Sequence, residues 1–419
     1  MTLDALPAYA GPLLARPVLR KVALHWNQGR LIVDLPDRSG ALRFGEPGSG
    51  PEARWSVRRW RALRRVLARG DLGFAAGYLA GDWDSPDLGA LLTAIASNYD
   101  HLGERVRGIR VLQLGGALAH ALNRNNRAGS RRNILAHYDL GNAFYAAWLD
   151  DGMTYSSALF EDPAAPLGEA QRRKYQTLAR AVGIRPGDSV LELGCGWGGF
   201  AEYAAGELGA TVTAVTLSPA QKAYAEERLF RAGLAERVSV RLLDYRDVAG
   251  TFDAAVSIEM FEAVGQAYWP VYFAHLARAL KPGGRAGLQV ITLRDDLFED
   301  YQRRPDFIQL EVFPGGMTPT NTHLAREAGA AGLTSDPPKW LRFGPDYART
   351  LRLWRERFER AWPEIEQLGF DDRFRRLWRY YLAYCEAGFE TGRTDVVQAV
   401  FRRCGAVPHE ERLARTPSA

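Results

Sequence analysis

The sequence predicts an α/β fold: a doubly wound, Rossmann-like parallel sheet preceded by a smaller, mainly helical N-terminal domain. From about residue 185 onward, short apolar runs alternate with segments of helical spacing, which is typical of parallel strands joined by helices. The first run ends in a glycine-rich turn at 194–199, and a helix is expected directly after it, over 200–205. The expected strands are Ser189–Leu193, Thr211–Thr216, Val238–Leu242, Ala254–Ile258 and Arg285–Ile291.

Helix signals agree with this alternation. A helix is expected over Trp269–Leu280, and Lys281-Pro-Gly-Gly284 is the stop signal and turn that ends it. In the N-terminal part, a strand is expected over Leu31–Leu35. A connecting helix and a basic linker are expected over 101–132, and we place the domain boundary there.

Length and composition exclude several classes of protein. The chain has 419 residues, of which 47% are hydrophobic and 25% charged, so it is globular and long enough for two domains. It has no run of 18 apolar residues, and its N-terminus lacks a basic start and a clean apolar core. We therefore expect neither a transmembrane helix nor a signal peptide. Cys195, Cys385 and Cys404 are too widely spaced for a disulfide framework or a metal-ligand pair, which favours a reducing cytosol and no bound metal.

Positive charge gathers in the N-terminal third. The net charge is +5, yet residues 1–132 hold 20 Lys and Arg against 11 Asp and Glu. The segment Trp55–Leu67 predicts a helix with Trp60, Leu63 and Leu67 on one face. Its arginines lie elsewhere around the helix, at Arg58, Arg61, Arg65 and Arg69. A basic amphipathic helix suits an anionic membrane surface, and packing against the protein's own core is the structural alternative.

The glycine turn alone leaves two classes of cofactor open. Gly194, Gly196 and Gly199 also satisfy the spacing of a dinucleotide-binding turn. A dinucleotide site, however, carries an acidic residue at the end of the second strand, whereas this strand ends in Thr216-Leu-Ser218. The acidic residue here precedes the turn, at Glu192. This arrangement favours an S-adenosylmethionine (SAM) site over an NAD site.

A series of further motifs extends over residues 60–405. They are Val66–Gly73, Tyr78–Trp83, His137–Asn142, Met153–Ser157, Leu193–Gly199, Thr216–Ser218 with Gln221, Asp244–Asp247, Met260–Glu262 with Val264-Gly265, Phe313–Gly316, Phe343–Tyr347, Trp362–Glu364 and Tyr380–Leu382. Together they resemble the cyclopropane-fatty-acyl-phospholipid synthases and the relatives that make mycolic acid cyclopropanes and methyl-branched lipids. A generic methyltransferase shares only the glycine turn and the strand order. The resemblance implies an N-terminal lipid-docking domain with its linker over 1–132, a class I SAM-dependent methyltransferase domain over 133–410, and a tail over 411–419.

The resemblance also implies the residues that contact SAM. Tyr138, Tyr155 and Ser156 correspond to contacts at the methionine end. The glycine turn contributes Glu192, Gly194, Cys195, Gly196, Trp197, Gly198 and Gly199. The ribose side corresponds to Thr216, Leu217, Ser218 and Gln221, and the adenine side to Asp244, Tyr245 and Arg246. A sulfonium cofactor needs carboxylate or aromatic faces near its charge and a dry pocket around its methyl group.

The chemistry that the resemblance implies is demanding. An alkene carbon attacks the methyl group of SAM, a carbocation forms on the neighbouring carbon, and a base must remove a proton. In the family a bound bicarbonate is the base, held by a Glu, a His, a Tyr and the neighbourhood of a Cys. The Glu corresponds to Glu262 and the Tyr to Tyr347, but the Cys is Ser157 here and the His is Gln289. An amide accepts and donates hydrogen bonds but does not relay a proton, so a bicarbonate can still bind here while the route of proton removal is left open.

Two more residues have family counterparts or ligand chemistry. Cys385 occupies a position assigned in the family as an active-site cysteine. Nothing near it in sequence would activate its thiol, and a carbocation route needs no such nucleophile. His137 has no second His or Cys at ligand spacing, so we expect it to be structural or close to the cofactor.

The sequence therefore predicts SAM-dependent transfer of a one-carbon unit to the double bond of an unsaturated phospholipid acyl chain. The product is a cyclopropane or a methylene or methyl-branched chain, and the second class requires a partner reductase. The expected partners are the phospholipid, an anionic membrane surface at the inner face of the cell membrane and a second copy in a homodimer, with no nucleic acid. The alternatives are a methyltransferase with another acceptor, such as a nucleic acid, and a SAM-binding lipid sensor that lost turnover through Ser157 and Gln289.

Overall fold

The computed structural model describes residues 19, 25–37, 40–102 and 140–404, and the chain forms two compact units. The first comprises Met1–Asn123, Glu299–Pro314 and Tyr347–Thr394, and the second comprises Arg124–Phe298, Gly315–Asp346 and Asp395–Ala419. This division differs from the expected 1–132, 133–410 and 411–419, because two later segments pack with the N-terminal part. The expected boundary at 132 and the tail lie outside the described residues.

The second unit contains a sheet with the order β10-β12-β9-β8-β5-β6-β7, and β11 pairs with β12. The strands β5 to β9 pair in parallel, which confirms the expected doubly wound arrangement. Their bounds are β5 Ser189–Leu193, β6 Thr211–Thr216, β7 Val238–Leu242, β8 Phe252–Ile258, β9 Leu280–Leu293, β10 Leu333–Ser335, β11 Leu341–Arg342 and β12 Thr394–Arg403.

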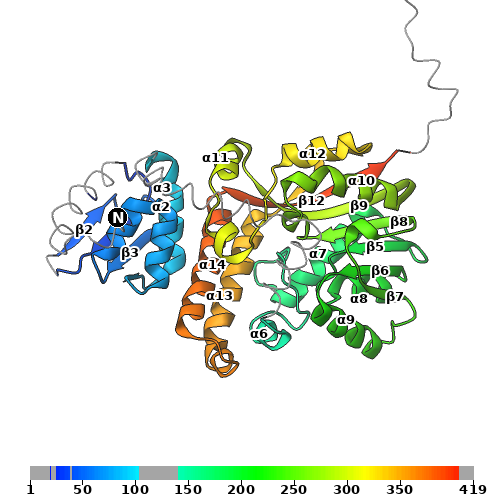
Figure 1. Cartoon of the computed structure of the whole chain (residues 1–419), viewed down its shortest axis with the longest axis horizontal. Coiled ribbons are helices and arrows are strands. Elements are labelled where there is room, and N and C mark those ends of the chain that lie inside the picture. The colour runs from blue at the N-terminus through cyan, green and yellow to red at the C-terminus, as the bar shows by residue number, and fades with distance from the viewer. Residues whose placement is uncertain (1–18, 20–24, 38–39, 103–139, 405–419) are drawn as a thin grey trace, which may run out of the picture. The chain divides into compact units, whose positions relative to one another are not determined.

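Helices lie on both sides of this sheet, with α8 and α9 on one side and α10 and α12 on the other (Figure 1). The helices of this unit are α6 Asn142–Ala146, α7 Leu167–Val182, α8 Gly199–Gly206, α9 Pro219–Arg231, α10 Trp269–Ala279 and α12 Asn321–Ala330. Short helical turns are η3 Tyr245–Asp247, η4 Phe261–Ala263, η5 Gln266–Tyr268, η6 Asp295–Leu297 and η8 Pro337–Lys339. Apolar side chains of α7, α8 and α9 form one buried cluster with β5, β6, β7 and β8. Each apolar strand is thus covered, as a parallel sheet requires.

The predicted strands agree closely with the observed ones. The bounds of β5, β6 and β7 are those expected, and β8 begins two residues earlier than predicted. The stop signal Lys281-Pro-Gly-Gly284 does end α10, but it continues as the first part of β9 rather than as a free turn. The register between β8 and β9 shifts there, because Phe252 pairs with Leu280 and Ala254 pairs with Arg285.

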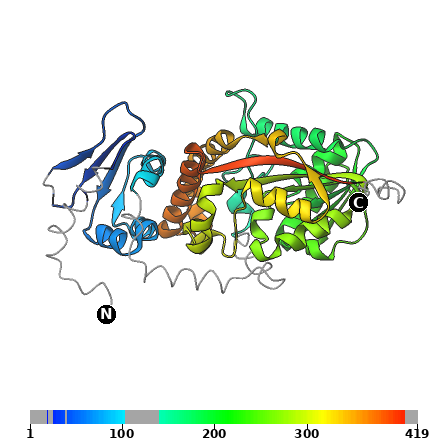
Figure 2. The ribbon, with the colours of Figure 1, turned by 90° about the horizontal axis from the view of Figure 1, so that it is seen from above.

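The first unit has its own four-stranded sheet, with the order β2-β1-β3-β4 (Figure 2). Its strands are β1 Arg30–Asp34, β2 Ala41–Phe44, β3 Glu52–Val57 and β4 Trp83–Asp84. Its helices are α2 Arg61–Leu79, α3 Leu88–Leu102, α11 Phe298–Arg303, the short η7 Ile308–Val312, most of α13 Gly344–Gln367, and α14 Asp372–Glu390. None of the helices in the described part of the chain combines the length and apolarity needed to span a bilayer.

The prediction of one helix over Trp55–Leu67 was wrong. Trp55 lies in β3, where Ala53, Trp55 and Val57 alternate with more exposed residues, and the helix α2 begins only at Arg61. The period-two burial of a strand overrides the helical spacing that the larger apolar residues suggested. The helix α2 is also interrupted at Gly70, whose φ of 60° and ψ of −130° are not helical.

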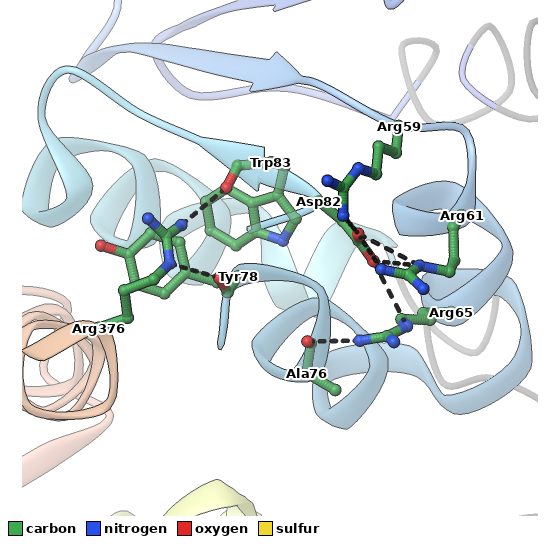
Figure 3. A network of polar contacts seen from close by, with 8 residues as sticks. All are labelled: Arg59, Arg61, Arg65, Ala76, Tyr78, Asp82, Trp83 and Arg376. Carbon is green, nitrogen blue, oxygen red and sulfur yellow. Dashed lines mark hydrogen bonds and ion pairs between the residues drawn. The ribbon is translucent and has the colours of Figure 1, made fainter. Parts of the chain in front are cut away.

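Asp82 gathers Arg61 and Arg65, two of the arginines expected around the basic helix, together with Arg59 (Figure 3). Its carboxylate is fully buried and accepts hydrogen bonds from Arg61 Nε at 3.0 Å and Arg61 Nη2 at 2.7 Å. Arg59 and Arg65 each place a nitrogen 3.5 Å from the same carboxylate. Part of the positive charge in this segment therefore neutralises an internal acid, which favours the structural alternative for these residues.

Arg376 of α14 joins a later segment of the chain to the same region (Figure 3). Its guanidinium lies 4.0 Å from the ring centroid of Tyr78 and donates hydrogen bonds to Tyr78 O at 2.7 Å and Trp83 O at 3.0 Å. Trp83 is fully buried, and its ring lies 4.1 Å from that of Phe74. The packing of α14 in the first unit thus includes the buried guanidinium of Arg376, which stacks on an aromatic ring and donates hydrogen bonds to backbone carbonyls.

Replacing Asp82 with Ala should destabilise the first unit by about 2 kcal/mol, below the roughly 3–5 kcal/mol of a fully buried pair. The expected loss of stability is smaller than for a fully buried pair because the partner arginines are 31% to 63% exposed. They are hydrated by water again when the carboxylate is lost. Hydrogen exchange of residues 61–84 would measure the effect. Glu299→Ala, which removes an exposed pair with Arg303, is the control and should leave protection unchanged. Equal protection in Asp82→Ala and wild type would contradict the role of Asp82.

Candidate functional site

The glycine turn follows β5 and is closed by the neighbouring strand. The amides of Gly194 and Cys195 both donate to Val215 O of β6 at 3.0 Å. Gly194 has a φ of 78°, and a Cβ atom there would lie 2.7 Å from Met260 Cγ. Gly198 has a φ of 85° and precedes the first residue of α8. These positions require glycine, so the turn can bring its backbone close to a ligand.

Glu192 is a buried acid, one residue before the end of β5. The residue is 2% exposed, and its Oε2 has no hydrogen-bond partner among the described residues. Burial raises the pKa of this carboxyl to about 8, while Arg228 acts in the opposite direction. A buried carboxyl with an unmatched oxygen beside a glycine turn suits a cationic ligand, which would supply the missing partner.

The end of β6 carries a hydroxyl and an amide in place of an acid. Thr216 Oγ1 donates to Gln221 Oε1 at 2.9 Å and accepts from Ser218 N at 3.1 Å. Ser218 caps α9 by accepting from Gln221 N at 3.3 Å. Leu217 between them is half-buried. The four residues expected on the ribose side therefore form one connected turn.

The turn after β7 holds an ion pair against aromatic rings. Arg246 donates to Asp244 Oδ1 at 2.7 Å and to Asp244 Oδ2 at 2.6 Å. Its guanidinium lies 5.3 Å from the ring centroid of Tyr245 and 5.6 Å from that of Tyr268. The Tyr245 hydroxyl is buried without a partner among the described residues, and burial raises its pKa to about 12. This turn provides flat surfaces and one unmatched hydroxyl, as expected of an adenine site.

Aromatic residues pack around the loop that carries the Met153–Ser157 motif. The ring of Tyr155 lies 5.4 Å from that of Tyr145 and 5.6 Å from that of Trp148. Trp197 of the glycine turn lies 5.0 Å from Tyr145 and donates from Nε1 to Asn142 Oδ1 at 2.8 Å. The motif and the glycine turn are thus joined through α6. Tyr138 and His137 lie outside the described residues.

Side chains of α7 hold the 153–157 loop by hydrogen bonds. Gln171 Nε2 donates to Ser156 O at 2.9 Å, Lys174 Nζ donates to Ser156 Oγ at 2.6 Å, and the Tyr175 hydroxyl lies 3.1 Å from Thr154 Oγ1. Met153 in the same loop has a φ of 51°. A non-glycine residue in this region is strained, and such strain persists only where surrounding contacts fix it.

Glu259 is the second strained residue, with a φ of 50°, and it lies where Ser157 and Gln289 meet. Its Oε1 accepts from Ser157 N at 2.8 Å and from Gln289 Nε2 at 2.8 Å. Gln289 Oε1 in turn accepts from Gln398 Nε2 of β12 at 3.1 Å, which fixes the direction of the Gln289 amide. The two positions that depart from the family's bicarbonate site therefore both bind a carboxylate of this chain.

Glu262 lies one turn further along, in η4. Its Oε1 accepts from Ile291 N at 2.5 Å, and its backbone O accepts from Met317 N at 2.9 Å. Its Oε2 is buried without a partner among the described residues. Burial, followed by the nearby charge of Glu259, raises the pKa of this carboxyl to about 8. At neutral pH Glu262 is protonated and its Oε2 side can donate a hydrogen bond.

Tyr347 and Cys385 belong to the first unit, whereas Glu262 belongs to the second. Tyr347 is buried and stacks on Phe389 with ring centroids 4.4 Å apart. Cys385 is half-buried, and burial followed by the charge of Asp306 raises the pKa of its thiol. A protonated thiol is a poor nucleophile, which supports packing rather than chemistry. Within the described ranges, no group of three or more His, Cys, Asp or Glu side chains is arranged to hold a metal ion.

Three residues of this site were not predicted from the sequence: Glu259, Lys174 and Gln398. A signal for Glu259 was present, since it precedes Glu262 by three residues at the end of a predicted strand. Lys174 also had a signal, because it lies four residues from both Ala170 and Leu178 on the apolar face of α7. Gln398 had none, since nothing in a sequence shows that β12 lies beside β9.

A family model described as mycolic acid cyclopropane synthetase matches residues 125–399. This chain belongs to that family. The match confirms the resemblance inferred from the sequence motifs, the α/β fold class and the expectation of an enzyme of the SAM-dependent methyltransferase class.

Full-length relatives extend the similarity beyond the matched region. The chain is 39% identical over 408 residues to the tuberculostearic acid methyltransferase UfaA1 of Mycobacterium tuberculosis, covering 95% of this chain and 93% of the relative. It is 35% identical over 392 residues to the cyclopropane-fatty-acyl-phospholipid synthase of Escherichia coli, covering 93% and 96%. Among solved structures, the mycolic acid cyclopropane synthase CmaA1, complexed with SAH and CTAB, has a TM-score of 0.61 and 28% identity. That comparison covers 65% of this chain and 98% of CmaA1.

The raised pKa values of Glu192 and Glu262 predict a pH-dependent loss of stability. Between about pH 4.5 and 8 the unfolded chain releases protons that these two carboxyls retain when folded, so folding becomes less favourable as pH rises. Gln at position 192 does not ionise, so the unfolding midpoint of Glu192→Gln should fall less from pH 5 to pH 7 than that of wild type, by a few degrees. Thermal unfolding at the two pH values measures this, with the exposed Glu226→Gln as control. An identical fall in Glu192→Gln and wild type would contradict the prediction.

Proposed function

We propose that this protein transfers a one-carbon unit from SAM to the double bond of an unsaturated acyl chain in a membrane phospholipid, and that Glu259 takes the departing proton. The coarser statement, SAM-dependent methylation or cyclopropanation of unsaturated lipid acyl chains, follows from the family and the relatives. The observation that carries the finer proposal is the carboxylate of Glu259, held by Ser157 N and Gln289 Nε2.

SAM is the cofactor, in agreement with a solved relative that is complexed with SAH. The residues present fit it, because Glu192 Oε2 and the Tyr245 hydroxyl are buried without partners among the described residues. We assign Glu192 and the glycine turn to the positively charged groups of SAM. Ser156 is assigned to the methionine end of the cofactor, and the Asp244–Arg246 turn to the adenine. When bound, SAM supplies a methyl group on a positively charged sulfur.

Glu259 suits the role of base by its surroundings. Methyl transfer to an alkene leaves positive charge on the neighbouring carbon, and a carboxylate both stabilises that charge and accepts a proton. Two N–H groups donate to Glu259 Oε1, which favours the ionised form of the carboxyl. The raised pKa of Glu262 nearby keeps that carboxyl protonated. Glu259 is therefore the proton acceptor of the pair, and Glu262 is the hydrogen-bond donor.

A bicarbonate, as the family resemblance implies, does not fit beside Ser157 and Gln289. The donors that these positions would offer to it are engaged by Glu259. Gln289 cannot turn its carbonyl towards Ser157 without giving up the hydrogen bond from Gln398. We therefore assign the proton-accepting role to the chain's own carboxylate.

The order of two steps decides the product. If the proton leaves the transferred carbon while the charge is on the neighbouring carbon, the ring closes to a cyclopropane. If a hydride first shifts from the methyl-bearing carbon to its neighbour, loss of a proton from the same transferred carbon leaves a methylene branch. Glu259 serves both routes, and for the second a partner reductase would convert the methylene to a methyl branch.

The proposal includes a location at the inner face of the cell membrane. Excess positive charge in residues 1–132 supports docking of the N-terminal part on an anionic bilayer. Arg54, Arg58 and Arg59 are more than half exposed even though each lies near an acid. A homodimer is part of the same proposal.

Substitutions of Glu259 test its role as base. Glu259→Gln should reduce turnover by at least about a hundredfold while leaving SAM binding unchanged, because an amide cannot accept the proton. Glu259→Gly relieves the positive φ and frees the donors of Ser157 and Gln289, so added bicarbonate should restore part of its activity. Wild type should keep full activity in bicarbonate-free buffer. A wild-type enzyme that needs bicarbonate, or a fully active Glu259→Gln, would refute the assignment.

The substrate and product are tested with liposomes of monounsaturated phospholipid, incubated with the protein and SAM. We expect the acyl chains to gain one CH₂, detected by mass spectrometry. Proton NMR then identifies the route, since high-field ring protons indicate a cyclopropane and vinylidene protons indicate a methylene branch. SAM binding without consumption would instead favour the lipid sensor, and consumption with another acceptor would refute the phospholipid substrate.

A further inference from the structure

Lys174 is a fully buried cation in the middle of α7. The other lysines that the structure describes pair with acids nearer the surface, and Lys281 and Lys339 are exposed while Lys222 is half-buried. A buried ammonium group is costly unless opposite charge or several acceptors compensate it. The position therefore calls for an explanation beyond packing.

The ammonium group of Lys174 has more donors than hydrogen bonds within the described structure. It has three donors and makes one hydrogen bond among the described residues, to Ser156 Oγ at 2.6 Å. It also lies 4.9 Å from the ring centroid of Tyr175, a cation–π contact that Tyr175→Phe retains. Burial lowers the pKa of Lys174 to about 7, while the charges of Glu259 and Asp150 act in the opposite direction. An additional anion close by would help the group to keep its proton.

The hydrogen bond also fixes the direction of the Ser156 hydroxyl. In its protonated form Lys174 only donates, so Ser156 Oγ accepts from it and the Ser156 proton must point to another acceptor. The described residues provide none for it. The backbone of Ser156 is held as well, because its O accepts from Gln171 Nε2 at 2.9 Å. A positively polarised O–H group is thus presented by a rigid loop.

We propose that Lys174 is a positioning residue that aims the Ser156 hydroxyl at the carboxylate of the methionine end of SAM. The inference rests on the proposed function, which assigns Ser156 to that end of the cofactor. A carboxylate is the chemistry that this arrangement selects, since it accepts the hydroxyl proton and compensates the buried positive charge. The amino group of the cofactor, a donor and a cation, cannot take this place.

A purely structural role predicts different behaviour. In that case Lys174 would only support the loop, as the Tyr175 hydroxyl does through Thr154 Oγ1 at 3.1 Å. Tyr175→Phe removes that support from the same helix and loop without changing a charge. It is the matched control for a substitution at Lys174.

The test compares two ligands by calorimetry. SAH carries the amino acid end, whereas 5′-methylthioadenosine has the same adenosine and sulfur but lacks the amino and carboxylate groups. Lys174→Met should weaken SAH binding by about tenfold or more and leave 5′-methylthioadenosine binding unchanged. Ser156→Ala should show the same selective loss, and the double variant should lose no more than either single one. Tyr175→Phe should change neither affinity selectively.

Each other outcome has a defined meaning. Unchanged SAH binding in Lys174→Met, equal loss for both ligands, or additive losses in the double variant would overturn the role of Lys174. If Lys174→Met does not fold, Lys174→Gln and the pair Ser156→Ala and Ser156→Thr apply the same test, and only variants with both the charge and the hydroxyl should keep full SAH affinity. A wild-type protein that binds neither ligand would refute the SAM site itself, which separates failure of the proposed function from failure of this inference.

Discussion

A partly buried carboxylate depends on donors that the protein supplies, and the polar interior of the larger unit is arranged around this constraint at Glu259. The backbone of Ser157 and the amide of Gln289 supply two hydrogen bonds to one oxygen, and Gln398 orients the amide. Side chains of α7 hold the loop that carries the Ser157 donor, through Ser156 O and Ser156 Oγ. The strained backbone at Met153 and at Glu259 shows that these contacts outweigh a local conformational cost of order 1–3 kcal/mol each.

The departures of this chain from its family's pattern become consistent with one another in this setting. The backbone N–H that position 157 donates to Glu259 is present with serine or cysteine, whereas a glutamine in place of histidine offers a donor that never carries a positive charge. With Glu259 between them, positions 157 and 289 form a binding place for a carboxylate that is part of the chain.

The sequence predicted the parallel sheet well and the polar interior poorly, for physical reasons. Strands β5 to β7 are short apolar runs between turn residues, so local pattern and tertiary burial agree. At Trp55 they disagree, because the alternation of Ala53, Trp55 and Val57 is too short to outweigh a helical spacing that continues to Leu67. Glu259 accepts hydrogen bonds from Ser157 and Gln289, which lie 102 and 30 positions away in the sequence. Its positive φ depends on those contacts, so a local sequence pattern shows neither the contacts nor the φ.

The contacts of Arg376 with Tyr78 and Trp83 have a consequence for how this family varies in length. CmaA1 corresponds to 65% of this chain and is 98% covered by it, so this chain carries about a third of its length beyond the part that the two share. In this chain α14 packs with α3 and places a buried guanidinium against Tyr78 and Trp83. Removal of the N-terminal segment would leave that cation and the aromatic surface around Tyr380 without their cover. The segment is therefore not a detachable appendage, and a shortened descendant would have to acquire a new polar surface on α14 before it could dispense with it.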